Sequence, residues 1–265
     1  MNEHFVLPKT YLVGYTAINF DGLKQYLQET DQPEFIDDIH EAQKKNLSDG
    51  EILCSFYAKA CYASLTAKKN KNISKTRPIF DNLLGILDSG HGSVIEHCSI
   101  NFMITNCSRV FTHELIRHRV GSAFSQTSGR YVRTDELNVV VDPILEPIYE
   151  LCEEARKFQE DWYKRAEEKL QLDKVKDFAT KKKLTSALRR FLPNGQSNEI
   201  GVSLNLRSLR HTIEMRTSQH AEWEIRVIFN QIYDLLKEKY PTMFIDAETK
   251  NIEGALEITF KNKKV

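Results

Sequence analysis

Residues 117–131 read RHRVGSAFSQTSGRY. In this stretch the basic tripeptide Arg117-His118-Arg119 precedes a segment of glycine, serine and threonine, which ends in Ser128-Gly129-Arg130. Backbone N–H groups, hydroxyl groups and guanidinium groups are the donors that hold a phosphate in proteins. We therefore predict an anion-binding loop over residues 120–129.

The segments upstream of this loop predict a strand and a helix. Residues 98–106, CSINFMITN, favour a strand. Residues 108–118 have helical spacing, which brings Arg109, His113 and Arg117 to one face of the predicted helix. The loop thus follows a helix with one basic face.

The rest of the chain predicts separated strands and long helices. Ser48 and Glu51 form the capping-box pattern that opens a helix, and Pro78 suits a first helical turn. Strands are predicted at 10–18 and 199–206, a loop at 68–77, and helices at 48–63, 78–90, 143–172, 175–191, 206–215 and 219–238. We expect an α/β or α+β fold, a single domain over residues 1–265 with a small mixed sheet and several long helices.

Length and composition favour a folded protein. The chain has 265 residues, 41% of them hydrophobic, and a formal net charge of zero, which excludes disorder as the main state. It has no apolar run long enough to span a bilayer and no secretory signal, so we expect a soluble, cytoplasmic protein. The five cysteines lack any C-x-x-C spacing, so neither a disulfide framework nor a metal site is expected.

The two kinds of basic residue are separated along the chain. Of the 14 arginines, five lie in 109–133 and six in 189–226, and these two stretches contain no lysine. With their five glutamates the stretches carry a charge of +6, and the rest of the chain carries −6. Arginine suits bidentate contact with phosphate or carboxylate, whereas lysine suits a solvated surface.

Two interpretations of the arginine stretches remain open. Some of the arginines have acidic neighbours at helical spacing, as Glu222 and Arg226 do, and would form structural ion pairs. The excess of positive charge favours a site for a polyanionic ligand instead. The second stretch supports this, since a helix over 206–215 would place Arg207 and His211 on one face.

Several common chemistries are excluded by spacing. A zinc protease needs H-E-x-x-H, but His113-Glu114 is followed by His118, one residue too far. The chain has neither a P-loop nor a G-x-G-x-x-G string. Cys98 is adjacent to His97, and neighbouring residues on a strand point to opposite faces, so we expect Cys98 to be a buried, inert thiol.

The sequence resembles the flavin-dependent thymidylate synthases. The resemblance lies in four ordered segments, HGSVIEH (91–97), RHRVGSAFSQTSGRY (117–131), RRFLP (189–193) and NLRSLRHTIEMR…HAEWEIR (205–226). It implies a methyltransferase of dTMP biosynthesis that is a homotetramer with shared active sites. FAD would be the cofactor, and a methylene group would pass from 5,10-methylenetetrahydrofolate to dUMP and be reduced, with NADPH recharging the flavin.

The resemblance also implies which residues bind each ligand. The implied flavin contacts are His91, Ser93, Arg117, His118, Arg119, Gln126, Asn205, Arg207 and His211. The implied dUMP contacts are Glu114, Arg117, Gln126, Thr127, Ser128, Gly129, Arg130, Arg189 and Arg216. Arg216 is the implied catalytic residue, because a fixed guanidinium stabilises negative charge that develops on the pyrimidine.

Two departures from the family pattern motivate an alternative. The loop before Ser128 is one residue longer than usual, and Glu114 stands where the family commonly has glutamine. A related flavin enzyme that acts on another pyrimidine nucleotide, or stops at hydroxymethylation, is therefore a second hypothesis. A nucleic-acid-binding module is a third, which zero net charge disfavours.

Overall fold

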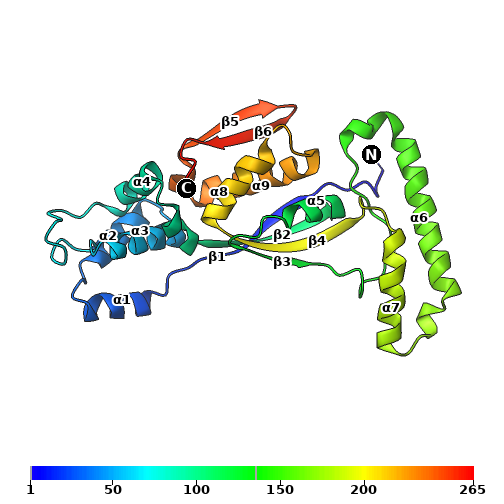
Figure 1. Cartoon of the computed structure of the whole chain (residues 1–265), viewed down its shortest axis with the longest axis horizontal. Coiled ribbons are helices and arrows are strands. Elements are labelled where there is room, and N and C mark those ends of the chain that lie inside the picture. The colour runs from blue at the N-terminus through cyan, green and yellow to red at the C-terminus, as the bar shows by residue number, and fades with distance from the viewer. Residues whose placement is uncertain (1, 135) are drawn as a thin grey trace. The chain divides into compact units, whose positions relative to one another are not determined.

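The computed structural model describes residues 2–134 and 136–265 of the chain (Figure 1). Its helices are α1 (Phe20–Glu29), α2 (Phe35–Lys44), α3 (Asp49–Cys61), α4 (Ile79–Ser89), α5 (Arg109–Leu115), α6 (Tyr149–Lys169), α7 (Phe178–Leu188), α8 (Leu206–Thr217) and α9 (Trp223–Lys239). Its strands are β1 (Lys9–Tyr15), β2 (Ser99–Ser108), β3 (Ser122–Gln126), β4 (Ser197–Asn205), β5 (Ala247–Ile252) and β6 (Ala255–Phe260). Short 3-10 helices cover Gly92–His97, Pro143–Ile148, Leu172–Lys174, Arg189–Phe191 and Pro241–Phe244.

The strands form two sheets. One has four strands in the order β1-β2-β4-β3. The other is the antiparallel pair of β5 and β6, in register from Ala247 opposite Phe260 to Ile252 opposite Ala255. Small sheets combined with many helices confirm the predicted fold class. No helix within the described residues is long and apolar enough to cross a membrane.

The chain divides into two compact units that interleave along the sequence. The first unit comprises Met1–Tyr11, Met103–His118 and Phe124–Val202. The second comprises Leu12–Phe102, Arg119–Ala123 and Ser203–Val265. Each unit therefore contains part of the sequence that resembles the flavin-dependent enzymes.

In the first unit, α6 and α7 lie side by side because apolar side chains from both fill the space between them (Figure 1). Tyr163 of α6 is buried with Leu172 and Leu188. The ring centroids of Trp162 and Phe191 are 4.7 Å apart, with 40° between the ring planes. This packing accounts for the buried face of an otherwise highly charged helix.

In the second unit, the β5–β6 hairpin lies against α8 and α9 (Figure 1). The amide of Asn230, on α9, accepts from the Leu256 N–H at 2.6 Å and donates to the Leu256 carbonyl at 2.8 Å. The hydroxyl of Thr217, on α8, accepts from the Ile258 N–H at 2.9 Å. These side chains satisfy backbone groups at the hairpin edge that faces the helices.

Several local predictions are confirmed. The Ser48 hydroxyl accepts from the Glu51 N–H at 3.3 Å, and the Glu51 carboxylate accepts from the Ser48 N–H at 2.9 Å, which is the expected capping box. Helix α4 begins directly after Pro78 and ends at Gly90, whose φ of 68° is left-handed. Cys98 is fully buried, and burial raises the pKa of its thiol to about 12.

Other predictions are wrong in part. The expected loop 120–129 contains strand β3. One side of this strand is exposed and polar, so its serines and glutamine do not give the apolar pattern from which a strand is predicted. The predicted helix 143–172 begins as a 3-10 helix, because Pro147 has no N–H to donate, and becomes regular only from Tyr149. Helices α1 and α2 and the β5–β6 hairpin were not predicted.

The second unit contains a fully buried arginine, Arg210 of α8. Its two terminal nitrogens each donate to one carboxylate oxygen of Asp246 at 2.9 Å. The same guanidinium donates to the carbonyls of Met243 and Val265 and lies 4.1 Å from the centre of the Phe260 ring. Arg210 thus joins α8 to the turn before β5 and to the end of the chain.

The substitution Asp246→Ala is expected to lower the free energy of unfolding by about 3–5 kcal/mol, because it leaves Arg210 buried without its counter-charge. The control is Asp234→Ala, which removes an exposed pair with Lys237 and should cost less than about 1 kcal/mol. Urea unfolding measures both, and equal losses in the two variants would contradict the role of Arg210.

The same pair predicts a pH dependence. Burial acts to raise the pKa of Asp246, but the hydrogen bonds and charge of Arg210 outweigh it, so the pKa is lowered from 3.8. A lowered pKa stabilises the fold above pH 3.8, and this stabilisation is lost as the pH falls through the folded-state value. The stability of Asp246→Ala should therefore fall less steeply in acid than that of the wild type.

Candidate functional site

In the first unit, two arginines lie close to Gly129. A Cβ atom added to Gly129 would be 3.1 Å from Nη2 of Arg109 and 3.4 Å from Cδ of Arg189. Arg109 is the first residue of α5, and Arg189 directly follows α7. Three segments distant in sequence therefore meet at Gly129, and a side chain at position 129 would occupy the space beside the two arginines.

The two guanidinium groups repel each other. Burial, and then the charge of Arg189, lower the pKa of Arg109. Within residues 2–134 and 136–265, neither arginine forms an ion pair. A cavity of about 360 Å³ has Arg109, Thr127 and Gly129 in its wall, together with Arg133 and the acidic residues Glu136 and Glu199, whereas Arg189 does not line it. Guanidinium groups beside a glycine and a hydroxyl are suited to bind an oxyanion.

The loop around Ser128 is shaped by its own hydrogen bonds. The carbonyl of Ser128 accepts from the N–H groups of Tyr131 and Val132 at 3.0 Å. The Thr127 N–H donates to the Glu199 carbonyl at 2.9 Å, and the Gln126 amide donates to the Thr112 hydroxyl at 3.3 Å. These contacts hold the loop against β4 and α5.

In the second unit, α8 begins against two glycine-containing segments. A Cβ atom on Gly92 would lie 2.7 Å from Nε of Arg207 and 2.8 Å from the carbonyl oxygen of Lys264. Arg207 also donates to the carboxylate of Glu96 at 2.6 Å. The absence of a side chain at position 92 therefore lets Arg207 lie directly on the backbone of the segment that holds His91.

The second of these glycines is Gly121, which has a φ of 65°. A Cβ atom there would lie 2.2 Å from Nδ2 of Asn205 and 2.7 Å from the hydroxyl of Ser208. Asn205 caps α8 by accepting from the Ser208 N–H at 2.8 Å, and its own N–H donates to the Gly121 carbonyl at the same distance. Position 121 must be glycine for both conformational and steric reasons.

The residues suggested by the resemblance fall into both units. The first unit holds Glu114, Arg117, His118, Gln126, Thr127, Ser128, Gly129, Arg130 and Arg189. The second holds His91, Ser93, Arg119, Asn205, Arg207, His211 and Arg216. Within each unit the structure brings segments distant in sequence together, at Gly129 and at the start of α8.

Comparison with known proteins identifies the family of this chain. The family model described as thymidylate synthase complementing protein matches residues 44–242. The flavin-dependent thymidylate synthase of Corynebacterium diphtheriae is 35% identical over 209 residues, 76% of this chain and 81% of that protein. The enzyme of the same name from Mycobacterium tuberculosis strain H37Rv is 36% identical over 216 residues, 79% of this chain and 84% of that protein.

This chain belongs to the thymidylate synthase complementing protein family. Membership confirms the resemblance drawn from the four ordered segments. The match covers Gly92, Gly121, Gly129 and the arginines that adjoin them, so the close approaches lie in the part of the chain that defines the family.

The structure revises the interpretation of the arginine stretches. Arg133 forms an ion pair with Glu167, and Arg210 is bound by Asp246, so both arginines have structural roles. Arg226, which the sequence pairs with Glu222, donates to the Ile252 carbonyl at 2.8 Å. Ion pairing thus accounts for part of the arginine excess, as the first interpretation expected.

One candidate site residue was missed from the sequence. Arg109 was predicted to share a helix face with His113 and Arg117, but it was given no ligand. The structure places it beside Gly129 and Arg189, from segments about 20 and 80 residues away in sequence. The available signal was an arginine at the start of a predicted helix, although spacing alone could not identify which residues it would lie beside in the fold.

The substitution Gly121→Ala is expected to destabilise the protein by about 2–4 kcal/mol, through left-handed strain and the clash with Asn205. Gly254→Ala is the matched control, since Gly254 has a φ of 82° but no heavy atom within 4 Å of an added Cβ. It should cost only the strain, about 1–2 kcal/mol. Thermal unfolding compares the variants, and a larger loss for Gly254→Ala would contradict the packing argument.

Proposed function

We propose that this chain is a flavin-dependent thymidylate synthase. It transfers a methylene group from 5,10-methylenetetrahydrofolate to dUMP and reduces it to give dTMP, with FAD as cofactor and NADPH as reductant. The observation that carries the proposal is the pair of Arg109 and Arg189 about Gly129, in a chain that belongs to the family. This pair is suited to a nucleotide monophosphate, since its two positive charges match a dianion.

The residues that we assign to dUMP come from α5 and the segment after it, the loop, the residue after α7, and α8. They are Glu114, Arg117, Gln126, Thr127, Ser128, Gly129, Arg130, Arg189 and Arg216. The guanidinium groups and the hydroxyl of Ser128 would bind phosphate oxygens. We assign Arg216 to the pyrimidine ring, where its charge would stabilise negative charge that develops during the reaction.

The proposed flavin contacts are His91, Ser93, Arg117, His118, Arg119, Gln126, Asn205, Arg207 and His211. The close approaches at Gly92 and Gly121 support this assignment, because they bring Arg207 and Asn205 against the segments that hold His91 and Arg119. Arg207 and Asn205 supply donors there, held by Glu96 and by the cap of α8. A bound flavin supplies hydride transfer, which none of the side chains provides.

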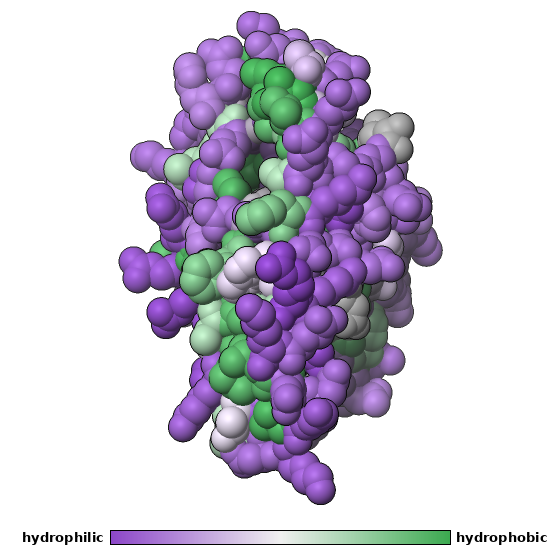
Figure 2. Space-filling model, turned by 90° about the vertical axis from the view of Figure 1, so that its right-hand side faces the viewer, coloured by the Kyte–Doolittle hydropathy of each residue, from purple (hydrophilic) through white to green (hydrophobic). Residues whose placement is uncertain are grey.

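A homotetramer is part of the proposal, and an exposed apolar face supports it. Ile144 and Ile148 of the 3-10 helix before α6, and Leu151 and Phe158 of α6, are each more than a third exposed. Figure 2 shows apolar side chains gathered in a band along the face of the molecule that holds α6. Apolar surface of this extent favours contact with another protein chain.

A cytoplasmic location and one functional domain over residues 1–265 remain predictions.

The alternatives from the sequence are not favoured. The chain covers more than four fifths of relatives that carry the name flavin-dependent thymidylate synthase, which supports the complete reaction over hydroxymethylation or another pyrimidine nucleotide. A nucleic-acid-binding module remains disfavoured by the zero net charge.

Purified protein is expected to be yellow and to retain FAD, with flavin absorbance at about 450 nm. Incubation with dUMP, 5,10-methylenetetrahydrofolate and NADPH should yield dTMP, identified by mass spectrometry. The same mixture without NADPH is the control. Protein that carries FAD but produces only a hydroxymethylated nucleotide, or no product, would exclude the proposed reaction.

The substitutions Arg109→Ala and Arg189→Ala should each weaken dUMP binding by about tenfold or more, because each removes a charge-assisted hydrogen bond to the phosphate. Arg190→Ala is the control, since Arg190 is the exposed neighbour of Arg189 and lies away from Gly129. Calorimetry with dUMP and with deoxyuridine separates phosphate recognition from base recognition. The variants should lose affinity for dUMP only, and an unchanged dUMP affinity in both would refute the assignment.

A further inference from the structure

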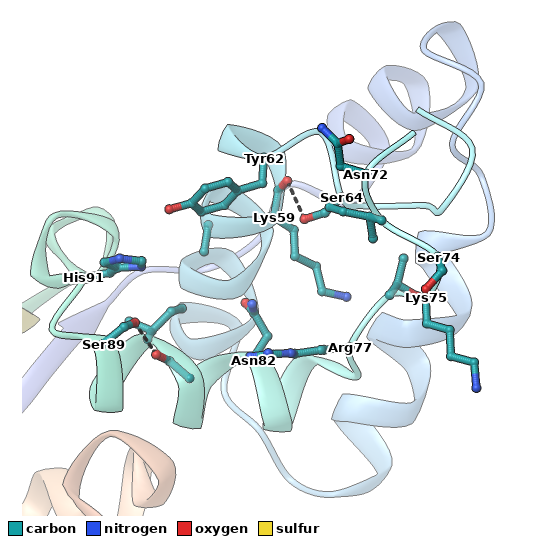
Figure 3. A pocket seen from close by; sticks show the side chains of 15 residues that line it. Lys59, Tyr62, Ser64, Asn72, Ser74, Lys75, Arg77, Asn82, Ser89 and His91 are labelled. Atoms are coloured by element: carbon teal, nitrogen blue, oxygen red, sulfur yellow. Dashed lines mark hydrogen bonds between the residues drawn. The ribbon is translucent and has the colours of Figure 1, made fainter. Parts of the chain in front are cut away.

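The second unit contains a cavity in whose wall His91 is the one proposed contact among the described lining residues (Figure 3). Its volume is about 430 Å³, which is in the range of small-molecule sites. The walls come from the end of α3, the segment 64–77 and one side of α4. The cavity therefore has the size for part of a ligand and lies next to a proposed flavin contact.

The charged groups in the cavity wall are positive. Lys59, Lys75 and Arg77 line it, and among the described lining residues there is no aspartate or glutamate. Lys59 is almost fully buried and pairs with Asp38 at 3.1 Å. In the part of the chain that the structure describes, Lys75 and Arg77 form no ion pair. The wall thus has an excess of positive charge that an anion would neutralise.

Arg77 can lie against α4 because Gly85 has no side chain. A Cβ atom on Gly85 would lie 3.0 Å from Nη1 of Arg77. Glycine inside a helix costs about 1 kcal/mol relative to alanine, so its place in α4 has a structural use. Figure 3 shows Arg77 lying along α4 towards Asn82, whose amide oxygen accepts from the Ser55 hydroxyl at 2.8 Å.

The opposite end of the cavity is aromatic. The ring of Tyr62 lies 6.4 Å from the ring of His91 with 28° between their planes, and both rings line the cavity. Tyr62 is 57% exposed, so its face is open to a ligand. Ser64 and Asn72 add polar groups to the cavity wall (Figure 3). A ligand with a ring at one end and an anionic group at the other matches this order of side chains.

We infer that this cavity binds the anionic end of a co-substrate, through Arg77 and Lys59, while the ring of that co-substrate lies towards Tyr62 and His91. The inference rests on the proposed function, since His91 is one of its flavin contacts. Two co-substrates carry an anion far from their reacting ring, the folate in its glutamyl carboxylates and NADPH in its 2′-phosphate. The shared chemistry is an oxyanion bound by guanidinium and ammonium groups.

Binding to the FAD-loaded protein distinguishes the two sources. Calorimetry compares tetrahydrofolate bearing one and five glutamates, and separately NADP⁺ and NAD⁺. If the anion is a carboxylate, Arg77→Gln should weaken binding of the pentaglutamate about tenfold and remove its advantage over the monoglutamate. If the anion is a phosphate, the same variant should instead weaken NADP⁺ about tenfold and leave NAD⁺ nearly unchanged.

Two further variants keep the test independent of folding. Lys71→Ala changes an exposed lysine of the same segment that does not line the cavity, and it should alter no affinity. Gly85→Ala should not lower the unfolding free energy, because alanine favours the helix, yet it should weaken the same ligand as Arg77→Gln.

The inference is overturned if Arg77→Gln and Gly85→Ala bind both co-substrates as the wild type does. It is also overturned if these variants lose affinity for FAD alone, which would assign the cavity to the cofactor. An Arg77-dependent affinity in a protein that forms no dTMP would keep the cavity assignment and reject the proposed reaction. The two failures are therefore distinguishable.

Discussion

The position of α8 depends on a single buried charge pair. The buried guanidinium of Arg210 donates hydrogen bonds to Asp246 and to the carbonyls of Met243 and Val265. The exposed residues of the same helix include Arg207 and His211, which we assign to the flavin. A helix with cations on two faces would be drawn into solvent if the buried cation were not neutralised, so the pair with Asp246 is a condition for presenting the other face.

The first turn of α8 is positioned by close contacts with two glycines as well as by hydrogen bonds. Gly92 and Gly121 come from different segments, and at both positions a Cβ atom would clash with the first residues of the helix. The cap provided by Asn205 ties one of these segments to α8 through two hydrogen bonds. Any larger side chain at either position would move the helix and with it Arg207. Glycine is therefore required at these two positions of the family motifs for a geometric reason that does not depend on the ligand.

Much of the fold could be predicted where local rules dominate. Ser48 with Glu51, and Pro78 with Gly90, mark helix ends through contacts within a few residues, and the structure has helices there. Strand β3 could not be predicted, because its pairing with β4 is a long-range contact and its own residues favour turns. Arg109 illustrates the same limit at the site. Its position on a helix face follows from spacing, but its partner Arg189 is brought close only by the tertiary fold.

Four arginines of the two lysine-free stretches show two different kinds of surroundings. Arg133 and Arg210 face carboxylates, which satisfy their forked donors and make them parts of the scaffold. Arg109 and Arg189 both adjoin Gly129 and form no ion pair within the described residues, and the charge of Arg189 adds to burial in lowering the pKa of Arg109. Folding alone gives no reason to keep two such charges together, whereas a dianion between them would turn repulsion into two attractions. The like-charge pair, more than the total number of arginines, is therefore what points to an anionic substrate.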